Sequence, residues 1–271
     1  MLFNRYLDGE FSYLGAAGDG LSASEEHEGA YFLNSFSWSV LSGCADEEQI
    51  RIMLDTMERR LWTPYGLKLV SPVALGRVSS HTASDEYFPG DRENGGVFKH
   101  ACMMAASAMF KGAKEVQDSA LAARLAGLGY WLIDRVMPYR TMEDPFRICG
   151  NPRFCTQYNN SETGENIGPM LSGTSTWLTL SLMTAWGLEY KEEGLVLNPV
   201  LRETDTNLSF TVNHDGTTYR IRIVKPEGFS RLRDTAASLT LDGQALPNGL
   251  VPHQNNGGVH EVELRFEVDE D

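Results

Sequence analysis

The chain has 271 residues and a mass of 30.1 kDa, and its composition (42% hydrophobic, 22% charged) is typical of a globular protein and not of a disordered one. The formal net charge is −14 and the pI is about 4.9. An acidic surface of this kind repels phosphate backbones and anionic lipids, which argues against nucleic acid and membranes as partners but leaves room for a small anion held by a local cluster of donors.

No stretch approaches the roughly 18–20 apolar residues that span a membrane, and the N-terminal residues MLFNRYLDGE do not read as a signal peptide. The cysteines, Cys44, Cys102, Cys149 and Cys155, form neither a CxxC pair nor a zinc-finger spacing with histidine. We therefore expect no metal site, a cytoplasmic location, and Cys102 as a reduced residue on the apolar face of a helix.

The first two thirds of the chain are predicted to be helical. Apolar residues at helical spacing and suitable start and stop residues predict helices over 31–42, 46–61, 97–111, 115–137 and about 173–187. The segments 63–96 and 138–170 are predicted to be long connections. Loops of that length in a compact domain are often functional.

After Gly187 the pattern changes to the alternation of β-strands. Residues 208–224 alternate around Asp215-Gly216, a dipeptide typical of a tight hairpin turn. The segments 238–246 and 260–268 repeat the alternation. This predicts a helical domain over 1–190 and an antiparallel β domain over 191–271.

The stretch YFPGDRENGGVFKHA at 87–101 combines a turn, an Arg-Glu pair, two glycines and a histidine that enters the next helix. Taken alone, an Arg-Glu dipeptide is usually a surface ion pair. A histidine at a helix start is usually a cap or a buried hydrogen-bonding group. A more specific interpretation needs further motifs.

Such motifs are present. The segment PGDRENGGVFKHA resembles the PG-x-[KR]-ENGG-x-[FY]-x-HA segment of glycoside hydrolase family 94, the cellobiose, cellodextrin and chitobiose phosphorylases. Other segments are similar to that family in the same order, namely YFLNSFSWSVLSG (31–43), TPYGL (63–67), NPRFCTQYNN (151–160) and MLSGTSTW (170–177). The resemblance implies a partial (α/α)6 barrel over 1–190, followed by a small antiparallel β sandwich.

Members of this family cleave a β-linked di- or oligosaccharide with phosphate and release a sugar 1-phosphate with inversion. The resemblance implies that Arg92, Glu93 and Gln157 bind the sugar. It assigns phosphate binding to His100, Gln157, Ser172 and Gly173, with inorganic phosphate as co-substrate and no other cofactor. A neutral amide such as that of Gln157 can serve both ligands, because it is donor and acceptor at once.

The catalytic Asp of the family lies in a segment resembling DWND, for which this sequence has no counterpart, so we expect the chain to carry no general acid and to be inactive alone. Association with a complementary N-terminal polypeptide, or a homodimer, would follow from an incomplete barrel. Two alternatives stay open: an inverting glycoside hydrolase of similar fold, and a non-catalytic carbohydrate-binding remnant.

Overall fold

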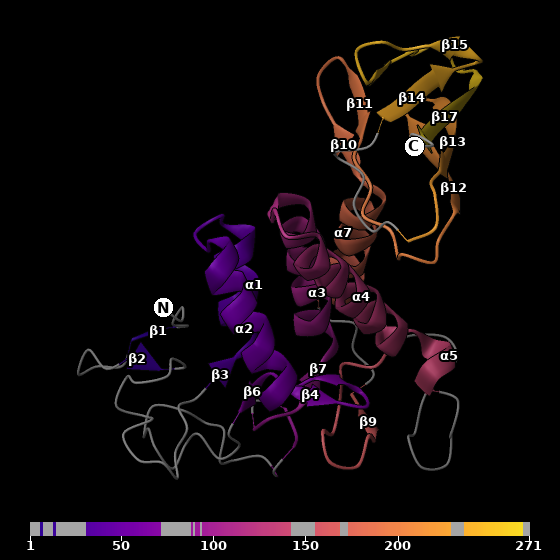
Figure 1. Ribbon diagram of the computed structural model, residues 1–271. Helices are drawn as coiled ribbons and strands as arrows, with labels where there is room; N and C mark the ends of the chain where they lie inside the picture. The colour runs from indigo at the N-terminus through magenta and orange to yellow at the C-terminus, as the bar shows by residue number, and fades with distance from the viewer. Residues whose placement is uncertain are drawn as a thin grey trace. The chain divides into compact units, whose positions relative to one another are not determined.

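The computed structural model describes residues 6–7, 13–14, 31–71, 88, 90–92, 94–141, 155–168, 173–228 and 236–267. It divides into two compact units. The first comprises residues 1–112 and 127–181, and the second comprises residues 113–126 and 182–271. The division at residue 190 expected from the sequence remains a prediction. Figure 1 follows the elements along the chain.

All five predicted helices are confirmed, and a short sixth, α5 (Pro138–Thr141), is found among the described residues. The five are α1 (Leu33–Leu41), α2 (Glu47–Arg60), α3 (Lys99–Glu115), α4 (Ser119–Val136) and α7 (Thr174–Trp186). None of these described helices is long and apolar enough to cross a membrane.

Helix α2 shows how the local sequence sets these boundaries. The Asp46 side chain accepts from the backbone N–H of Gln49, and the Gln49 side chain accepts from the backbone N–H of Asp46. This reciprocal pair satisfies two N–H groups that the first turn leaves without a partner. The side of α2 that faces away from solvent is buried, as the 3.6-residue spacing predicts. It consists of Ile50, Met53, Leu54 and Met57.

Helix α3 is buried along most of its length, and small residues allow its neighbours to approach closely. The alanines at 101, 105, 106 and 108 are fully buried. Gly129 of α4 faces the ring of Phe110, and a Cβ atom at that glycine would lie only 2.9 Å from Cζ of the ring. The packing of this core therefore depends on alanine and glycine residues as well as on large side chains.

Short strands, which the sequence did not predict, lie in the long connections and also replace the first two residues of the predicted helices 31–42 and 97–111. Two antiparallel pairs join β3 (Tyr31–Phe32) to β6 (Val70–Ser71) and β4 (Trp62–Thr63) to β5 (Gly66–Leu67). A three-stranded sheet contains β7 (Val97–Phe98), β8 (Tyr158–Asn159) and β9 (Asn166–Ile167). A further pair joins β1 (Tyr6–Leu7) to β2 (Tyr13–Leu14). Two residues are too few to show a periodic pattern.

The second unit contains two sheets (Figure 1). Side chains from both form one apolar core. The smaller has the order β10 (Leu188–Tyr190), β11 (Gly194–Leu197), β16 (Leu250–Pro252). The larger has the order β12 (Asn207–His214), β13 (Thr217–Val224), β17 (Val259–Glu267), β14 (Ala236–Leu241), β15 (Gln244–Ala245). The hairpin predicted around Asp215-Gly216 is confirmed, with His214 opposite Thr217.

The expectation of an entirely antiparallel domain is wrong at one pair. Strand β17 runs parallel to β13, with Ile221 opposite Val262, and it lies between β13 and β14 in the larger sheet. The long connection from β13 to β17 contains the β14–β15 hairpin and β16, so the chain can return to the end of the sheet where β13 began. Alternation indicates a strand but does not identify its neighbour.

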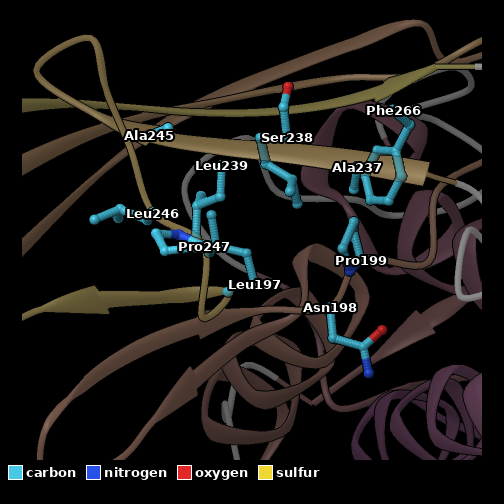
Figure 2. Close-up of a pocket in the computed structure, with 12 residues that line it drawn as sticks. Leu197, Asn198, Pro199, Ala237, Ser238, Leu239, Ala245, Leu246, Pro247 and Phe266 are labelled. Carbon is cyan, nitrogen blue, oxygen red and sulfur yellow. The ribbon is translucent and has the colours of Figure 1, made fainter.

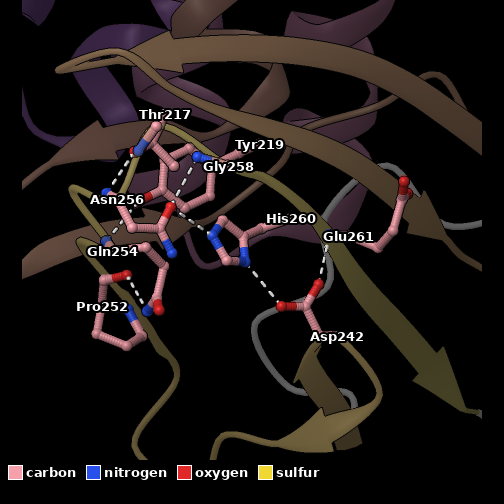
Figure 3. A network of polar contacts seen from close by, with 10 residues as sticks. Thr217, Tyr219, Asp242, Pro252, Gln254, Asn256, Gly258, His260 and Glu261 are labelled. Atoms are coloured by element: carbon pink, nitrogen blue, oxygen red, sulfur yellow. Dashed lines mark hydrogen bonds and ion pairs between the residues drawn. The ribbon is translucent and has the colours of Figure 1, made fainter.

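A polar network fixes the start of this parallel pair (Figure 3). The hydroxyl of Thr217 accepts from the backbone N–H groups of Asn256 (3.0 Å) and Gly257 (3.1 Å). The Tyr219 hydroxyl accepts from the N–H of Gln254 at 2.7 Å. Since Thr217 is fully buried, water cannot replace its oxygen as the acceptor. The loop that leads into β17 is thus held by two side chains of β13.

Replacing Thr217 with the isosteric Val would leave two backbone N–H groups without their acceptor, and we expect it to lower the free energy of unfolding by about 2–3 kcal/mol. Thr218→Val is the matched control. The neighbouring hydroxyl donates to the side chain of Asn213 on the exposed side of the strand, and its loss should cost less than about 0.5 kcal/mol. Urea unfolding of both variants tests this. Equal losses would mean that the network does not stabilise the loop.

Candidate functional site

The loop that carries the Arg-Glu pair is held in a tight, backbone-bonded conformation. The N–H of Gly90 donates to the carbonyl of Asn94, and the N–H of Gly96 donates to that of Arg92. A Cβ atom at Gly96 would lie 2.5 Å from the backbone nitrogen of Arg92, which only glycine avoids. Gly95 has a φ of 90°, and Asn94 is buried. These residues therefore shape the loop.

Arg92 is connected to His100 through two aromatic rings. Its Nε donates to the Tyr158 hydroxyl at 3.2 Å, and its guanidinium carbon lies 6.0 Å from the centre of that ring. Tyr158 stacks on Phe98 with ring centres 5.3 Å apart, and Phe98 meets the His100 ring edge-on at 6.4 Å. The pairing of β7 with β8 places Phe98 opposite Tyr158. It therefore brings the loop and the segment around residue 157 together.

Gln157 is joined to the start of α3 by its backbone. Its carbonyl accepts from the N–H of Lys99 at 3.0 Å, and its N–H donates to the carbonyl of Gly168 at 3.0 Å. Gly168 has a φ of 76°, and a Cβ atom there would lie 2.8 Å from Oε1 of Gln157. Because Gly168 has no side chain, there is room for the Gln157 amide.

Gly173 lies beside His100 at the start of α7. A Cβ atom at Gly173 would be 3.7 Å from Cδ2 of the His100 ring and 3.4 Å from Cδ1 of Trp177. His100 is in the first turn of α3, and Gly173 directly precedes α7. The first N–H groups of a helix have no partner within it and attract anions. The fold thus brings the N-termini of two helices to one place.

Thr174 was not singled out from the sequence. It is fully buried, and its hydroxyl has no hydrogen-bond partner among the residues that the structure describes. Its only sequence signal is its position directly after Gly173.

Lys99 is the second side chain that the sequence reasoning missed, although it belongs to the FKHA segment. It is 2% exposed, and its ammonium donates to the carbonyl of Arg135 in the last turn of α4 at 3.4 Å. Burial lowers its pKa from 10.5 to about 8, against the opposing effect of the thiols of Cys102 and Cys155. The negative end of the α4 dipole favours the charge at this position.

Burial also lowers the pKa of His100 below its usual 6.5. At neutral pH the ring is then mostly neutral, with one nitrogen as donor and the other as acceptor. Shifted pKa values of this kind are common in functional sites.

Four of the predicted site residues are thus linked in one region of the first unit: Arg92, His100, Gln157 and Gly173. Glu93 and Ser172 lie outside the described residues. The binding roles of all six remain predictions.

A cavity of about 440 Å³ lies elsewhere, in the second unit, and holds none of the predicted residues (Figure 2). Its lining is mainly apolar, from Leu197 to Phe266. Among the described residues, no three His, Cys, Asp or Glu side chains are placed to hold a metal ion.

Comparison with known proteins gives a match to one family. Residues 4–183 match the model of the glycosyl hydrolase 94 superfamily, catalytic domain. This range contains every predicted site residue and ends within α7.

Curated relatives give matches over almost the whole chain. The 3-O-beta-D-glucopyranosyl-beta-D-glucuronide phosphorylase of Paenibacillus borealis is 26% identical over 96% of this chain and 33% of its own length. The N,N'-diacetylchitobiose phosphorylase of Vibrio proteolyticus is 25% identical over 90% and 29%. The cellobionic acid phosphorylase of Neurospora crassa is 27% identical over 81% and 28%. The chain spans a third or less of the length of these relatives.

The buried Lys99 predicts a stability that rises with alkaline pH. Its ammonium releases a proton near pH 8 in the folded chain and near pH 10.5 in the unfolded chain. Between these values the unfolded chain binds more protons, so the free energy of unfolding increases by at most about 1.4 kcal/mol per pH unit. From pH 9 the thiol of Cys102 opposes this, because burial raises its pKa from 9.0 to about 11.

We expect the free energy of unfolding of the wild-type chain, relative to Lys99→Met, to rise by about 1 kcal/mol between pH 8 and 9. Above pH 9 the value for the wild-type chain itself should level off, because the Cys102 contribution opposes that of Lys99. Urea unfolding at several pH values measures this. In Cys102→Ala the rise should continue above pH 9. A wild-type chain that shows no rise relative to Lys99→Met would contradict the burial of a charged Lys99.

His100 should titrate below pH 6.5, because its ring is partly withdrawn from water. NMR of the ring Cε1–H signal over pH 4.5–8 gives the midpoint, and His100→Gln identifies the signal by its loss. A midpoint at or above 6.5 would show that the ring is more exposed, or closer to a carboxylate, than described.

Proposed function

The chain belongs to the glycosyl hydrolase 94 superfamily, and from this membership we propose that it supplies the phosphate-binding and sugar-binding part of an inverting glycoside phosphorylase. In the proposed reaction, an oxygen of inorganic phosphate attacks the anomeric carbon of a β-linked di- or oligosaccharide. The bond from that carbon to the glycosidic oxygen breaks, and the released oxygen takes a proton from a general acid. The products are a sugar 1-phosphate and a shortened saccharide.

The observation that carries this proposal is the position of His100 beside Gly173, at the N-termini of α3 and α7. A neutral imidazole can donate one hydrogen bond to a phosphate oxygen. The first N–H groups of α7 supply further donors along the positive end of its dipole. An inverting hydrolase would place a water and a carboxylate base on this face of the sugar instead.

The sugar side of the proposed site comprises Arg92, Glu93 and the amide of Gln157. Charged groups hold hydroxyls more firmly than neutral ones do. The contact of the Arg92 Nε with the Tyr158 hydroxyl limits the positions that the guanidinium can take. The carbonyl of Gln157 accepts from the N–H of Lys99, the residue before His100, and this proximity supports an amide that contacts both sugar and phosphate.

The general acid is proposed to come from outside these 271 residues. A complementary N-terminal polypeptide would supply this acid and complete a barrel of the (α/α)6 kind. A homodimer could complete the barrel but would not supply the acid. The share of the relatives that the chain spans, 28–33%, supports this. Without a general acid, turnover should fall by about 10²–10⁴-fold. A cytoplasmic location is part of the same proposal.

The names of the relatives above give different saccharides as their substrates. We therefore propose only a β-linked saccharide as the substrate and do not specify its sugar units. An inverting hydrolase would give free sugar in the absence of phosphate. A non-catalytic carbohydrate-binding remnant would bind sugar but give no turnover with any partner.

The test is release of sugar 1-phosphate from cellobiose, cellodextrins, chitobiose and β-1,2-glucans, by the chain with and without the complementary polypeptide. We expect activity only in the completed enzyme and only with phosphate. There, His100→Ala should raise KM for phosphate by about 10–100-fold, the value of a hydrogen bond to a charged group.

Glu93→Ala is the matched variant and should raise KM for the sugar instead. Turnover without phosphate would favour the hydrolase. Equal effects of the two variants on both KM values would contradict the assignment of separate phosphate and sugar sides.

A further inference from the structure

We propose that a strip of side chains on the first unit is a second saccharide-binding surface, outside the candidate site. This aromatic strip comprises Trp62, Trp131, Asp134, Arg135, Tyr139 and Arg140, from β4, α4 and α5. None of these residues has a part in the reaction described above. The ligand class, a neutral β-linked oligosaccharide, rests on the proposed function.

Trp62 forms one end of the strip, and its ring packs on another aromatic ring. Its ring stacks on Trp131 with centres 6.0 Å apart and planes at 18°. The guanidinium of Arg135 lies 5.9 Å from the centre of the Trp131 ring, a cation–π distance. Trp62 is nevertheless 51% exposed, so a large part of a ring that is already held in place remains open to solvent.

Tyr139 forms the other end and is 59% exposed. Its hydroxyl donates to Asp134, and the guanidinium of Arg140 lies 5.5 Å from its ring centre. Asp134 also accepts from Arg140 at 2.7 Å and from Arg135 at 3.0 Å. A continuous set of contacts therefore runs from Trp62 to Tyr139 and keeps both exposed rings in fixed positions.

This chemistry matches a saccharide. A β-linked pyranose presents flat C–H faces that stack on aromatic rings, while its hydroxyls project from the edge. The guanidinium groups of Arg135 and Arg140 place N–H donors beside the rings, and the carboxylate of Asp134 places an acceptor there. Because the rings and charges are held before binding, little conformational entropy is lost when a ligand docks.

Other ligands fit less well. The chain carries a net charge of −14, and this field disfavours a polyanion. The area of two exposed rings is also far smaller than the roughly 800 Å² per partner that a stable protein interface buries. A neutral sugar chain needs neither a large interface nor a favourable net charge.

The experiment is calorimetric titration of the chain with cellohexaose. We expect Trp62→Ala and Tyr139→Ala each to weaken binding by about tenfold, the value of one aromatic contact. Trp62→Phe should retain most of the affinity, and it keeps the test valid if Trp62→Ala fails to fold. Tyr190→Ala is the matched control, because Tyr190 is 44% exposed but belongs to the second unit.

All titrations are repeated in an Arg92→Ala, His100→Ala background, which removes the candidate site. If Trp62→Ala and Tyr139→Ala still weaken sugar binding in this background, the result supports the aromatic strip. It does so even if no phosphorolysis is found and the proposed function fails. Three results would overturn it. These are no binding at millimolar sugar, the same affinity in wild type and Trp62→Ala, or a dimer in sedimentation that Trp62→Ala dissolves.

Discussion

One backbone hydrogen bond, from the N–H of Lys99 to the carbonyl of Gln157, is the constraint on which the candidate site depends. It ties the first residue of α3 to a segment more than fifty positions later in the chain. Because of this bond, the backbone segments that carry His100 and Gln157 lie next to each other. The same lysine extends its buried ammonium to the carbonyl of Arg135, so three elements meet at a single residue. A buried charge is costly, and here the end of a helix offsets part of that cost.

The sequence predicted the elements that rest on periodicity or on turn chemistry. The five helices and the hairpin at Asp215-Gly216 follow from spacing and from the residues at their ends. It did not predict the two-residue strands β7, β8 and β9, which carry no period yet place Phe98 opposite Tyr158. It also gave the wrong direction for β17 relative to β13, because alternation does not encode the order of strands.

For the candidate site, motifs indicated Arg92, His100, Gln157 and Gly173, and the fold links them. Motifs did not indicate Lys99, Tyr158 or Thr174, whose parts depend on burial and on contacts between distant segments. Gly168 is a similar case. A glycine in sequence suggests a turn, but only the fold shows that a Cβ atom at this one would meet the Gln157 amide. Residues that support a site are thus harder to read from sequence than residues that would touch a ligand.

The central claim is that His100 and the N-terminus of α7 bind one phosphate ion together. Titration of isotope-labelled protein with inorganic phosphate, followed by amide NMR, tests it most directly. We expect the signals of His100 and Gly173 to shift with the same dissociation constant, and His100→Ala to weaken the response at Gly173. Signals that do not move, or that move with different constants, would contradict it.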